Sequence, residues 1–278
     1  MISRKDITKH RTLLRSYGVE AIIEADDPKI FEKVKTIASQ ALVGRLSFED
    51  VNEPAERPVY SFLTNEKGTV EFDIAGVTTG DYKEDFGFER FLNAAIRAHI
   101  AAMSKSWVFL HAGVVEWRGK AIILPGQSHK GKTTLVSELI QIGAGYMSDE
   151  YAVMDENGLV HPFERDLGVR FTPDDGPTPV DPAVFGGARA KKPVEAGLIV
   201  FTGFVKNAEW RPERMTLGSG ILESVPEVIP FSFNTEFVLK VLNTTFNRAI
   251  IVKSDRGEAL YTAPKILEYF DRLIIDVR

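Results

Sequence analysis

The stretch of sequence that decides the fold reads Gly126-Gln127-Ser128-His129-Lys130-Gly131-Lys132-Thr133-Thr134. It satisfies the pattern G-x-x-x-x-G-K-[ST] of a phosphate-binding loop. The apolar run from Ala121 to Leu124 precedes it and predicts a strand, and the residues from Lys132 onward predict a helix. This context matters, because loop amides and the positive end of a helix dipole together bind phosphate oxygens.

The loop also predicts which cofactors the chain uses. Lys132 supplies a point charge for the phosphates and Thr133 a hydroxyl for Mg2+, so we expect ATP and Mg2+ to bind across residues 126 to 134. An Asn-Lys-x-Asp guanine motif is absent from the sequence, which disfavours a GTPase switch. The sequence alone leaves GTP and pyrophosphate open as donors. The alternative, in which these residues bind no phosphate, is a glycine turn with an exposed lysine.

Two carboxylates follow at the end of the next predicted strand, in Ser148-Asp149-Glu150. At a strand end the chain turns, so both side chains can face one site. We expect Asp149 to hold Mg2+ and Glu150 to take the proton of an acceptor hydroxyl, which is the division of labour that phosphoryl transfer requires. The alternative is a solvated acidic turn.

Three further residues are candidates for the site. His111 ends a predicted strand 15 positions before Gly126, and a histidine in such a place is more often structural than functional. Arg165 can clamp a phosphate, and Glu164 can join Asp149 and Thr133 as a metal ligand. Surface charge is the competing interpretation for both.

Composition excludes several classes of protein. The 278 residues carry a formal net charge of −5, which disfavours a general nucleic-acid binder. The sequence holds no cysteine, which rules out thiolate nucleophiles, Cys-ligated zinc and disulfides. We expect no membrane span and a cytoplasmic location. A homo-oligomer stays open.

The pattern along the chain predicts two domains of an α/β protein. Residues 1–104 read as a small α+β domain and residues 105–278 as a phosphate-loop domain. We predict a polar helix from about Asp6 to Arg15, ended by Tyr17-Gly18, and a longer helix from Phe86 to Met103. Leu217-Gly218-Ser219-Gly220 reads as a glycine turn.

The run from His111 to Glu150 resembles the catalytic domain of HPr kinase/phosphorylase, the bacterial enzyme that phosphorylates a serine of the phosphocarrier protein HPr. The resemblance covers roughly residues 105 to 205, and phosphoenolpyruvate carboxykinase is similar in its Gly-Lys-Thr-Thr loop. It implies a phosphate-loop domain of the HPr kinase and phosphoenolpyruvate carboxykinase type. It also implies that His111 and Glu150 lie near the acceptor hydroxyl, with Thr133 and Asp149 at magnesium.

The sequence departs from that family in its loop residues His129-Lys130 and in Glu150, where the family has a second Asp. The resemblance implies a kinase that phosphorylates a hydroxyl, of serine type, on a protein or peptide, with acceptor recognition or regulation in the N-terminal domain. Two alternatives stay open, namely a nucleotide-binding regulatory module without transfer and a kinase of a small-molecule hydroxyl.

Overall fold

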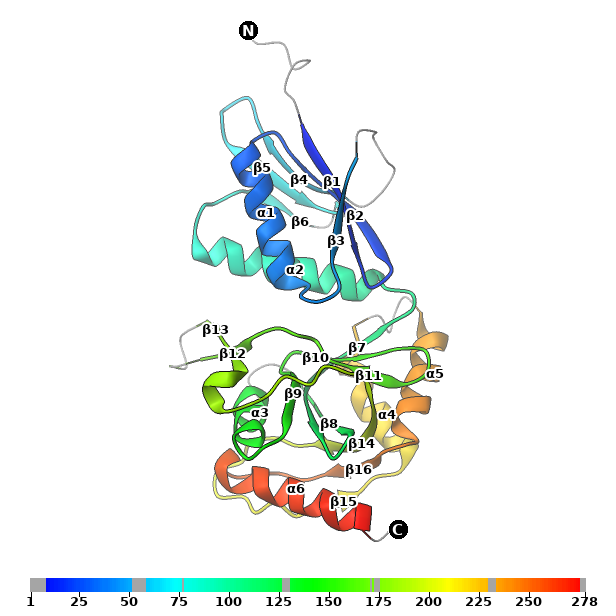
Figure 1. Ribbon diagram of the computed structural model, residues 1–278. Helices are drawn as coiled ribbons and strands as arrows, with labels where there is room; N and C mark the ends of the chain where they lie inside the picture. The colour runs from blue at the N-terminus through cyan, green and yellow to red at the C-terminus, as the bar shows by residue number, and fades with distance from the viewer. Residues whose placement is uncertain are drawn as a thin grey trace. The chain divides into compact units, whose positions relative to one another are not determined.

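The computed structural model shows a mixed α/β protein with several sheets (Figure 1). It describes residues 9–51, 59–76, 78–126, 131–170, 172, 176–229 and 234–275. The chain divides into two compact units, Met1–Lys105 and Ser106–Arg278. Each unit has its own sheet and its own helices.

The first unit is a mixed sheet with two helices. Its strands lie in the order β3-β1-β2-β4-β5-β6, with β2 and β4 parallel and the other neighbours antiparallel. Asp27 caps α1 and Pro28 opens it, as the Asp-Pro pair favours. The elements are β1 (His10–Ser16), β2 (Val19–Ala25), α1 (Pro28–Ala41), β3 (Ser47–Asp50), β4 (Val59–Thr64), β5 (Val70–Ile74), β6 (Thr78–Asp81) and α2 (Phe86–Met103).

The predicted helix from Asp6 to Arg15 is wrong over its described part. His10–Ser16 is a strand that pairs with β2 on one side and β3 on the other. Tyr17 and Gly18 both have positive φ, 49° and 74°, and form a two-residue hairpin turn between Ser16 and Val19. A Tyr-Gly pair with left-handed backbone serves a helix end and a hairpin equally well, so the local signal is ambiguous.

The second unit is built around three parallel strands, β8, β14 and β16, in a sheet of order β11-β10-β7-β8-β14-β16-β15. Strand β9 pairs with β7, and β11 also pairs with β14. The elements are β7 (Val108–Trp117), β8 (Lys120–Pro125), α3 (Lys132–Gln141), β9 (Gly145–Ser148), β10 (Tyr151–Met154), β11 (Leu159–His161), β12 (Leu167–Val169), β13 (Thr178–Val180), η1 (Pro182–Phe185), β14 (Val194–Phe201), β15 (Glu213–Arg214), α4 (Leu217–Ser224), η2 (Val225–Glu227), α5 (Thr235–Phe246), β16 (Ile250–Lys253) and α6 (Ala259–Ile275).

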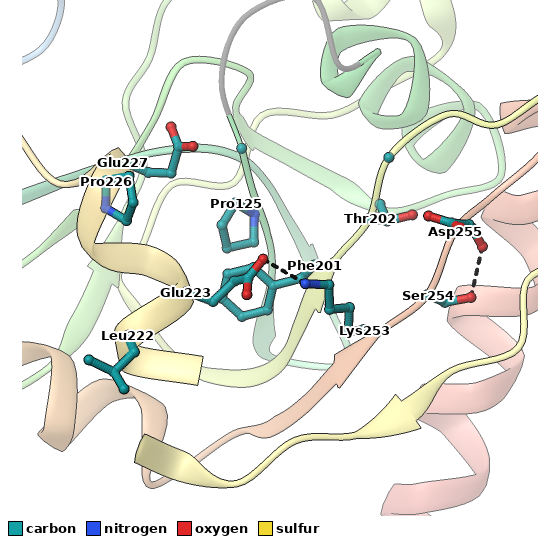
Figure 2. Close-up of a pocket in the computed structure, with 12 residues that line it drawn as sticks. Pro125, Phe201, Thr202, Leu222, Glu223, Pro226, Glu227, Lys253, Ser254 and Asp255 are labelled. Atoms are coloured by element: carbon teal, nitrogen blue, oxygen red, sulfur yellow. Dashed lines mark hydrogen bonds and ion pairs between the residues drawn. The ribbon is translucent and has the colours of Figure 1, made fainter. Parts of the chain in front are cut away.

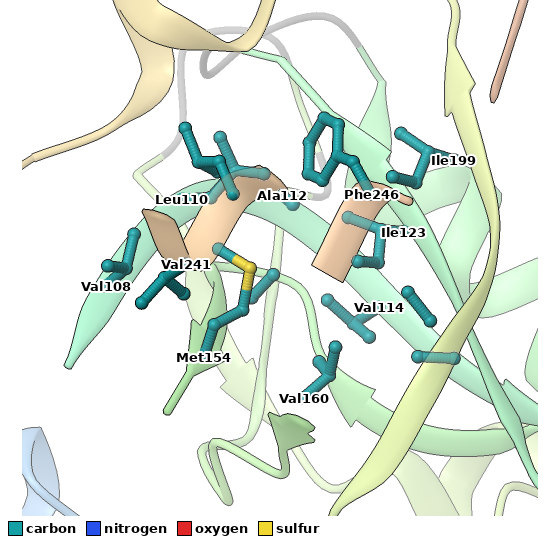
Figure 3. Packing of buried hydrophobic residues seen from close by; sticks show 14 of the residues in the cluster. Val108, Leu110, Ala112, Val114, Ile123, Met154, Val160, Ile199, Val241 and Phe246 are labelled. Carbon is teal, nitrogen blue, oxygen red and sulfur yellow. The ribbon is translucent and has the colours of Figure 1, made fainter. Parts of the chain in front are cut away.

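Two apolar clusters hold this unit together. One gathers residues of β7, β8, β10, β14 and α5, including Val114, Ile123, Val241 and Phe246 (Figure 3). The other joins the sheet to α3 and α6. Because helices pack on both faces, the central strands are apolar on both sides, as in buried parallel sheets.

Two further expectations are wrong. His111 does not end a strand, because β7 runs unbroken from Val108 to Trp117. The glycine turn at Leu217–Gly220 is the first turn of α4, capped by Thr216. A Cβ at Gly220 would lie 2.9 Å from Ile251 side-chain atoms, so this glycine allows close packing of the helix on β16.

Among the described helices, none is both long and apolar enough to span a bilayer.

Candidate active site

Gly131 stands between the predicted phosphate loop and α3. It takes a left-handed conformation, φ 73°, at the position before Lys132, and its carbonyl accepts the first helical hydrogen bond from Leu135 N–H at 3.1 Å. The helix predicted from Lys132 is thereby confirmed. The predicted loop residues Gln127, Ser128, His129 and Lys130 lie outside the described residues.

Arg256 supports this junction from the other end of the sequence. Its Nη2 donates to the Gly131 carbonyl at 2.9 Å, and its Nη1 donates to the Gly257 carbonyl at 3.0 Å. The side chain is only 2% exposed, and burial lowers the pKa of its guanidinium. A buried cation therefore fixes the backbone where the loop meets the helix.

Gly126 ties the start of the loop to β7. Its N–H donates to the His111 carbonyl at 3.1 Å, one residue beyond the Ala112–Pro125 strand pair. His111 and Gly126 are thus neighbours, although the sequence separates them by 15 positions.

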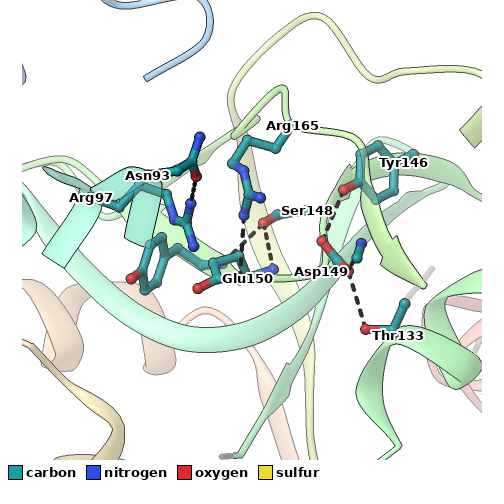
Figure 4. A network of polar contacts seen from close by, with 10 residues as sticks. Asn93, Arg97, Thr133, Tyr146, Ser148, Asp149, Glu150 and Arg165 are labelled. Carbon is teal, nitrogen blue, oxygen red and sulfur yellow. Dashed lines mark hydrogen bonds and ion pairs between the residues drawn. The ribbon is translucent and has the colours of Figure 1, made fainter. Parts of the chain in front are cut away.

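Asp149 is the buried member of the carboxylate pair (Figure 4). Its Oδ2 accepts from the Thr133 hydroxyl at 3.1 Å and from the Gly168 N–H at 2.8 Å, and its Oδ1 accepts from the Tyr146 hydroxyl at 3.2 Å. Burial raises the pKa of Asp149, and the hydrogen bond from Gly168 partly opposes that rise. A cation bound beside Asp149 would favour its ionised form.

Glu150 has a different environment, although it follows Asp149 directly. Its carboxylate lies 3.4 Å from Arg165 Nη1, and its side chain is 30% exposed. The Ser148 hydroxyl accepts from the N–H groups of Glu150 and Tyr151, each at 3.0 Å, and shapes the bend between β9 and β10 (Figure 4). The bend presents Asp149 to Thr133 and Glu150 to Arg165.

His111 faces the same bend. It lies opposite Tyr151 in the β7–β10 pairing, and the Ala112 N–H donates to the Glu150 carbonyl at 3.2 Å. Burial lowers the pKa of His111, the charge of Glu150 raises it, and the charge of Lys132 lowers it. The imidazole is therefore neutral at pH 7, and it lies within electrostatic reach of both Lys132 and Glu150.

The oxygen ligands around Asp149 fit magnesium. Mg2+ prefers oxygen, keeps several waters and commonly takes one or two protein ligands plus substrate phosphates. The Thr133 hydroxyl and the Asp149 carboxylate supply such a pair. Within the described ranges, no group of three or more His, Cys, Asp or Glu side chains is placed to hold a metal ion.

Glu164, the other predicted metal ligand, is exposed. Its backbone carbonyl accepts from Arg189 Nη1 at 3.3 Å, and among the described residues no hydrogen bond joins its carboxylate to Thr133, which donates to Asp149 instead. The structure therefore brings together His111, Lys132, Thr133, Asp149, Glu150 and Arg165, and it leaves Glu164 outside this group. Thr134, the last residue of the predicted loop, is exposed on α3.

Sequence reasoning missed Arg256 and Tyr146. Arg256 follows Gly131 by 125 positions, so no local pattern indicates that they touch. Tyr146 lies three residues before Asp149, in the strand that leads to the carboxylates. This short spacing was the signal in the sequence that could have indicated their contact.

Comparison with solved structures finds chains that are similar to this one, among them a kinase. The structure of the Hpr(Ser) kinase/phosphatase from Coxiella burnetii aligns with 60% of this chain and 98% of its own, with 18% sequence identity and a TM-score of 0.33. No protein-family model matches the chain, and no curated protein matches it.

Proposed function

We propose that this protein is a kinase that uses ATP and Mg2+ to phosphorylate a hydroxyl, of serine type, on a protein or peptide. The observation that carries the proposal is the 3.1 Å contact between the Thr133 hydroxyl, in the first turn after the phosphate loop, and the buried Asp149 carboxylate. Phosphate-loop enzymes hold magnesium with a Ser or Thr and an Asp in these roles.

Five of the six residues of this group have a part in this reaction. Lys132 and the loop amides neutralise the phosphates, and Thr133 with Asp149 holds the metal. Bound Mg2+ would screen the charge on the phosphate oxygens. Arg256 keeps the Gly131 carbonyl in place, so the loop end is positioned before nucleotide binds.

Glu150 acts as the base. The acceptor oxygen forms a bond to the γ-phosphorus while the bond from that phosphorus to the β,γ-bridging oxygen breaks. The hydroxyl proton passes to the Glu150 carboxylate, and ADP leaves with the bridging oxygen. Arg165 Nη1 lies 3.4 Å from the Glu150 carboxylate. Its guanidinium can leave this ion pair and bind the transferred phosphoryl group.

The test is transfer of label from γ-labelled ATP with Mg2+, in extract of the native cells, with Lys132→Ala as control. We expect label in a protein or peptide fraction with the wild type only. Label in a metabolite fraction would indicate a small-molecule kinase. Tight binding of Mg·ATP without any transfer would contradict the proposal and indicate a regulatory nucleotide-binding module.

A further inference from the structure

A pocket of about 600 Å3 opens beside Gly126, at the carboxyl ends of the parallel strands β8, β14 and β16 (Figure 2). Pro125, Phe201 and Lys253 are the last residues of these strands and all line it. Ligands of parallel α/β sheets bind at this edge, in pockets of about 300 to 1,000 Å3. The pocket therefore has the position and the size of a ligand site next to the phosphate loop.

Glu227 lines this pocket and is 7% exposed. Its Oε2 is buried and accepts no hydrogen bond within the described part of the chain. A buried carboxylate oxygen without a donor is unfavourable, so such groups are normally paired. A bound ligand with an N–H or O–H donor would satisfy this oxygen.

Glu227 also lies beside His111. Val228 forms an antiparallel bridge with Leu110, and the Ile229 N–H donates to the Phe109 carbonyl at 3.1 Å. One position further along this register, Glu227 comes next to His111, and its charge acts on that imidazole. This end of the pocket thus adjoins the residues to which we assign the acceptor hydroxyl.

The charges in the pocket select the kind of ligand. Glu223 and Lys253 neutralise one another at 2.8 Å, whereas Glu227 and Asp255 lie at opposite ends (Figure 2). Among the described residues, no ion pair joins a lysine or arginine to either of these two carboxylates. The end at Glu227 therefore repels phosphate and attracts a cation.

We propose that Glu227 binds a cationic group of the acceptor, an ammonium or guanidinium that lies close to the hydroxyl receiving the phosphoryl group. This inference rests on the proposed kinase function and names its substrate class. A lysine or arginine side chain of a peptide and the amino group of a small hydroxyamine share this chemistry. Glu227 supplies specificity through charge-assisted hydrogen bonds, and it takes no part in the bond changes.

The first experiment measures label transfer from γ-labelled ATP to serine peptides that carry Lys, Arg or norleucine at each position flanking the serine. Serinamide and 3-hydroxypropanamide form the matched small-molecule arm, with and without the amine. We expect the wild type to favour the cationic member of a pair by about tenfold or more in kcat/KM, mainly through KM. Glu227→Gln should reduce that preference to about twofold or less, whereas Glu223→Gln should keep it.

The second measurement separates this inference from the kinase proposal. Agmatine, which carries a guanidinium and an ammonium group, is titrated into the protein with Mg2+ and a non-hydrolysable ATP analogue. Binding to the wild type that Glu227→Gln loses supports the cation site even if no acceptor is phosphorylated. Transfer without charge preference, equal agmatine binding by both proteins, or a loss of ATP affinity in Glu227→Gln would overturn the inference.

Discussion

The two carboxylates at the bend between β9 and β10 are adjacent in sequence and differ in burial and in hydrogen bonding. Asp149 is 8% exposed and accepts hydrogen bonds from Thr133, Tyr146 and Gly168, whereas the side chain of Glu150 is 30% exposed and faces the guanidinium of Arg165. A buried, fully hydrogen-bonded carboxylate suits a fixed metal ligand. A partly exposed carboxylate beside an exchangeable guanidinium suits a group that must take up a proton.

The largest effect is expected from a variant that removes the base and leaves the metal ligand in place. Glu150→Gln should lower phosphoryl transfer by about 100- to 10,000-fold, the usual contribution of a general base. Its affinity for Mg·ATP, measured by calorimetry, should stay within about twofold of the wild type, because its side chain is not assigned to the nucleotide. Transfer near the wild-type rate would mean that Asp149 or His111 is the base.

Lys132→Ala, unlike Glu150→Gln, should weaken the binding of ATP itself. The loss of a charge-assisted contact to phosphate should lower ATP affinity by about 10- to 100-fold. The rise in melting temperature that ATP gives the wild type should disappear with it. An unchanged ATP affinity would refute the phosphate-loop assignment itself.

Gly131→Ala tests the support that Arg256 gives the loop. Gly119→Ala is the matched control, since Gly119 also has positive φ, 77°, with nothing within 4 Å of an added Cβ. The control should lose about 1 kcal/mol in free energy of unfolding from backbone strain alone. At Gly131 the Cβ would lie 2.5 Å from Arg256 Nη2, so a larger loss and weaker ATP binding are expected. If urea unfolding showed an equal loss of free energy of unfolding in both variants, the Arg256 contact would contribute little to stability.

The smallest effect is expected from substitution of His111, which should change how the free energy of unfolding depends on pH. Burial lowers its pKa from the ordinary value of 6.5, so the unfolded chain binds its proton first as the pH falls. The wild type should therefore lose stability as pH falls below 6.5, and His111→Gln should lose less over the same interval. Urea unfolding at several pH values measures this difference. If the free energy of unfolding changed with pH by the same slope in both proteins, a buried, neutral His111 would be contradicted.

Local signals allowed several elements of the second unit to be predicted. The apolar run before Gly126 and the residues from Lys132 form β8 and α3, and the Asp149-Glu150 pair stands at the end of a short strand as expected. Lys132, Thr133 and Asp149 are predicted as nucleotide and metal ligands because the chemistry of a phosphate loop demands such residues, and these roles stay predictions.

Other features were beyond local patterns. The Tyr17-Gly18 turn supports a hairpin as well as a helix end, and the pairing of β1 with β2 and β3 decides between them. Gly220 allows a close helix contact with Ile251, which only the packed structure reveals. Arg256 reaches Gly131, and Glu227 comes beside His111, through contacts between residues more than 100 positions apart.

The central claim, that Thr133 and Asp149 hold magnesium against the phosphates of ATP, is tested most directly by the effect of Mg2+ on ATP affinity. Calorimetric titrations with and without Mg2+ would compare the wild type with Asp149→Asn, and circular dichroism would confirm that the variant is folded. Mg2+ should strengthen ATP binding by the wild type and have little effect on the variant. The same strengthening by Mg2+ in both proteins would contradict the account.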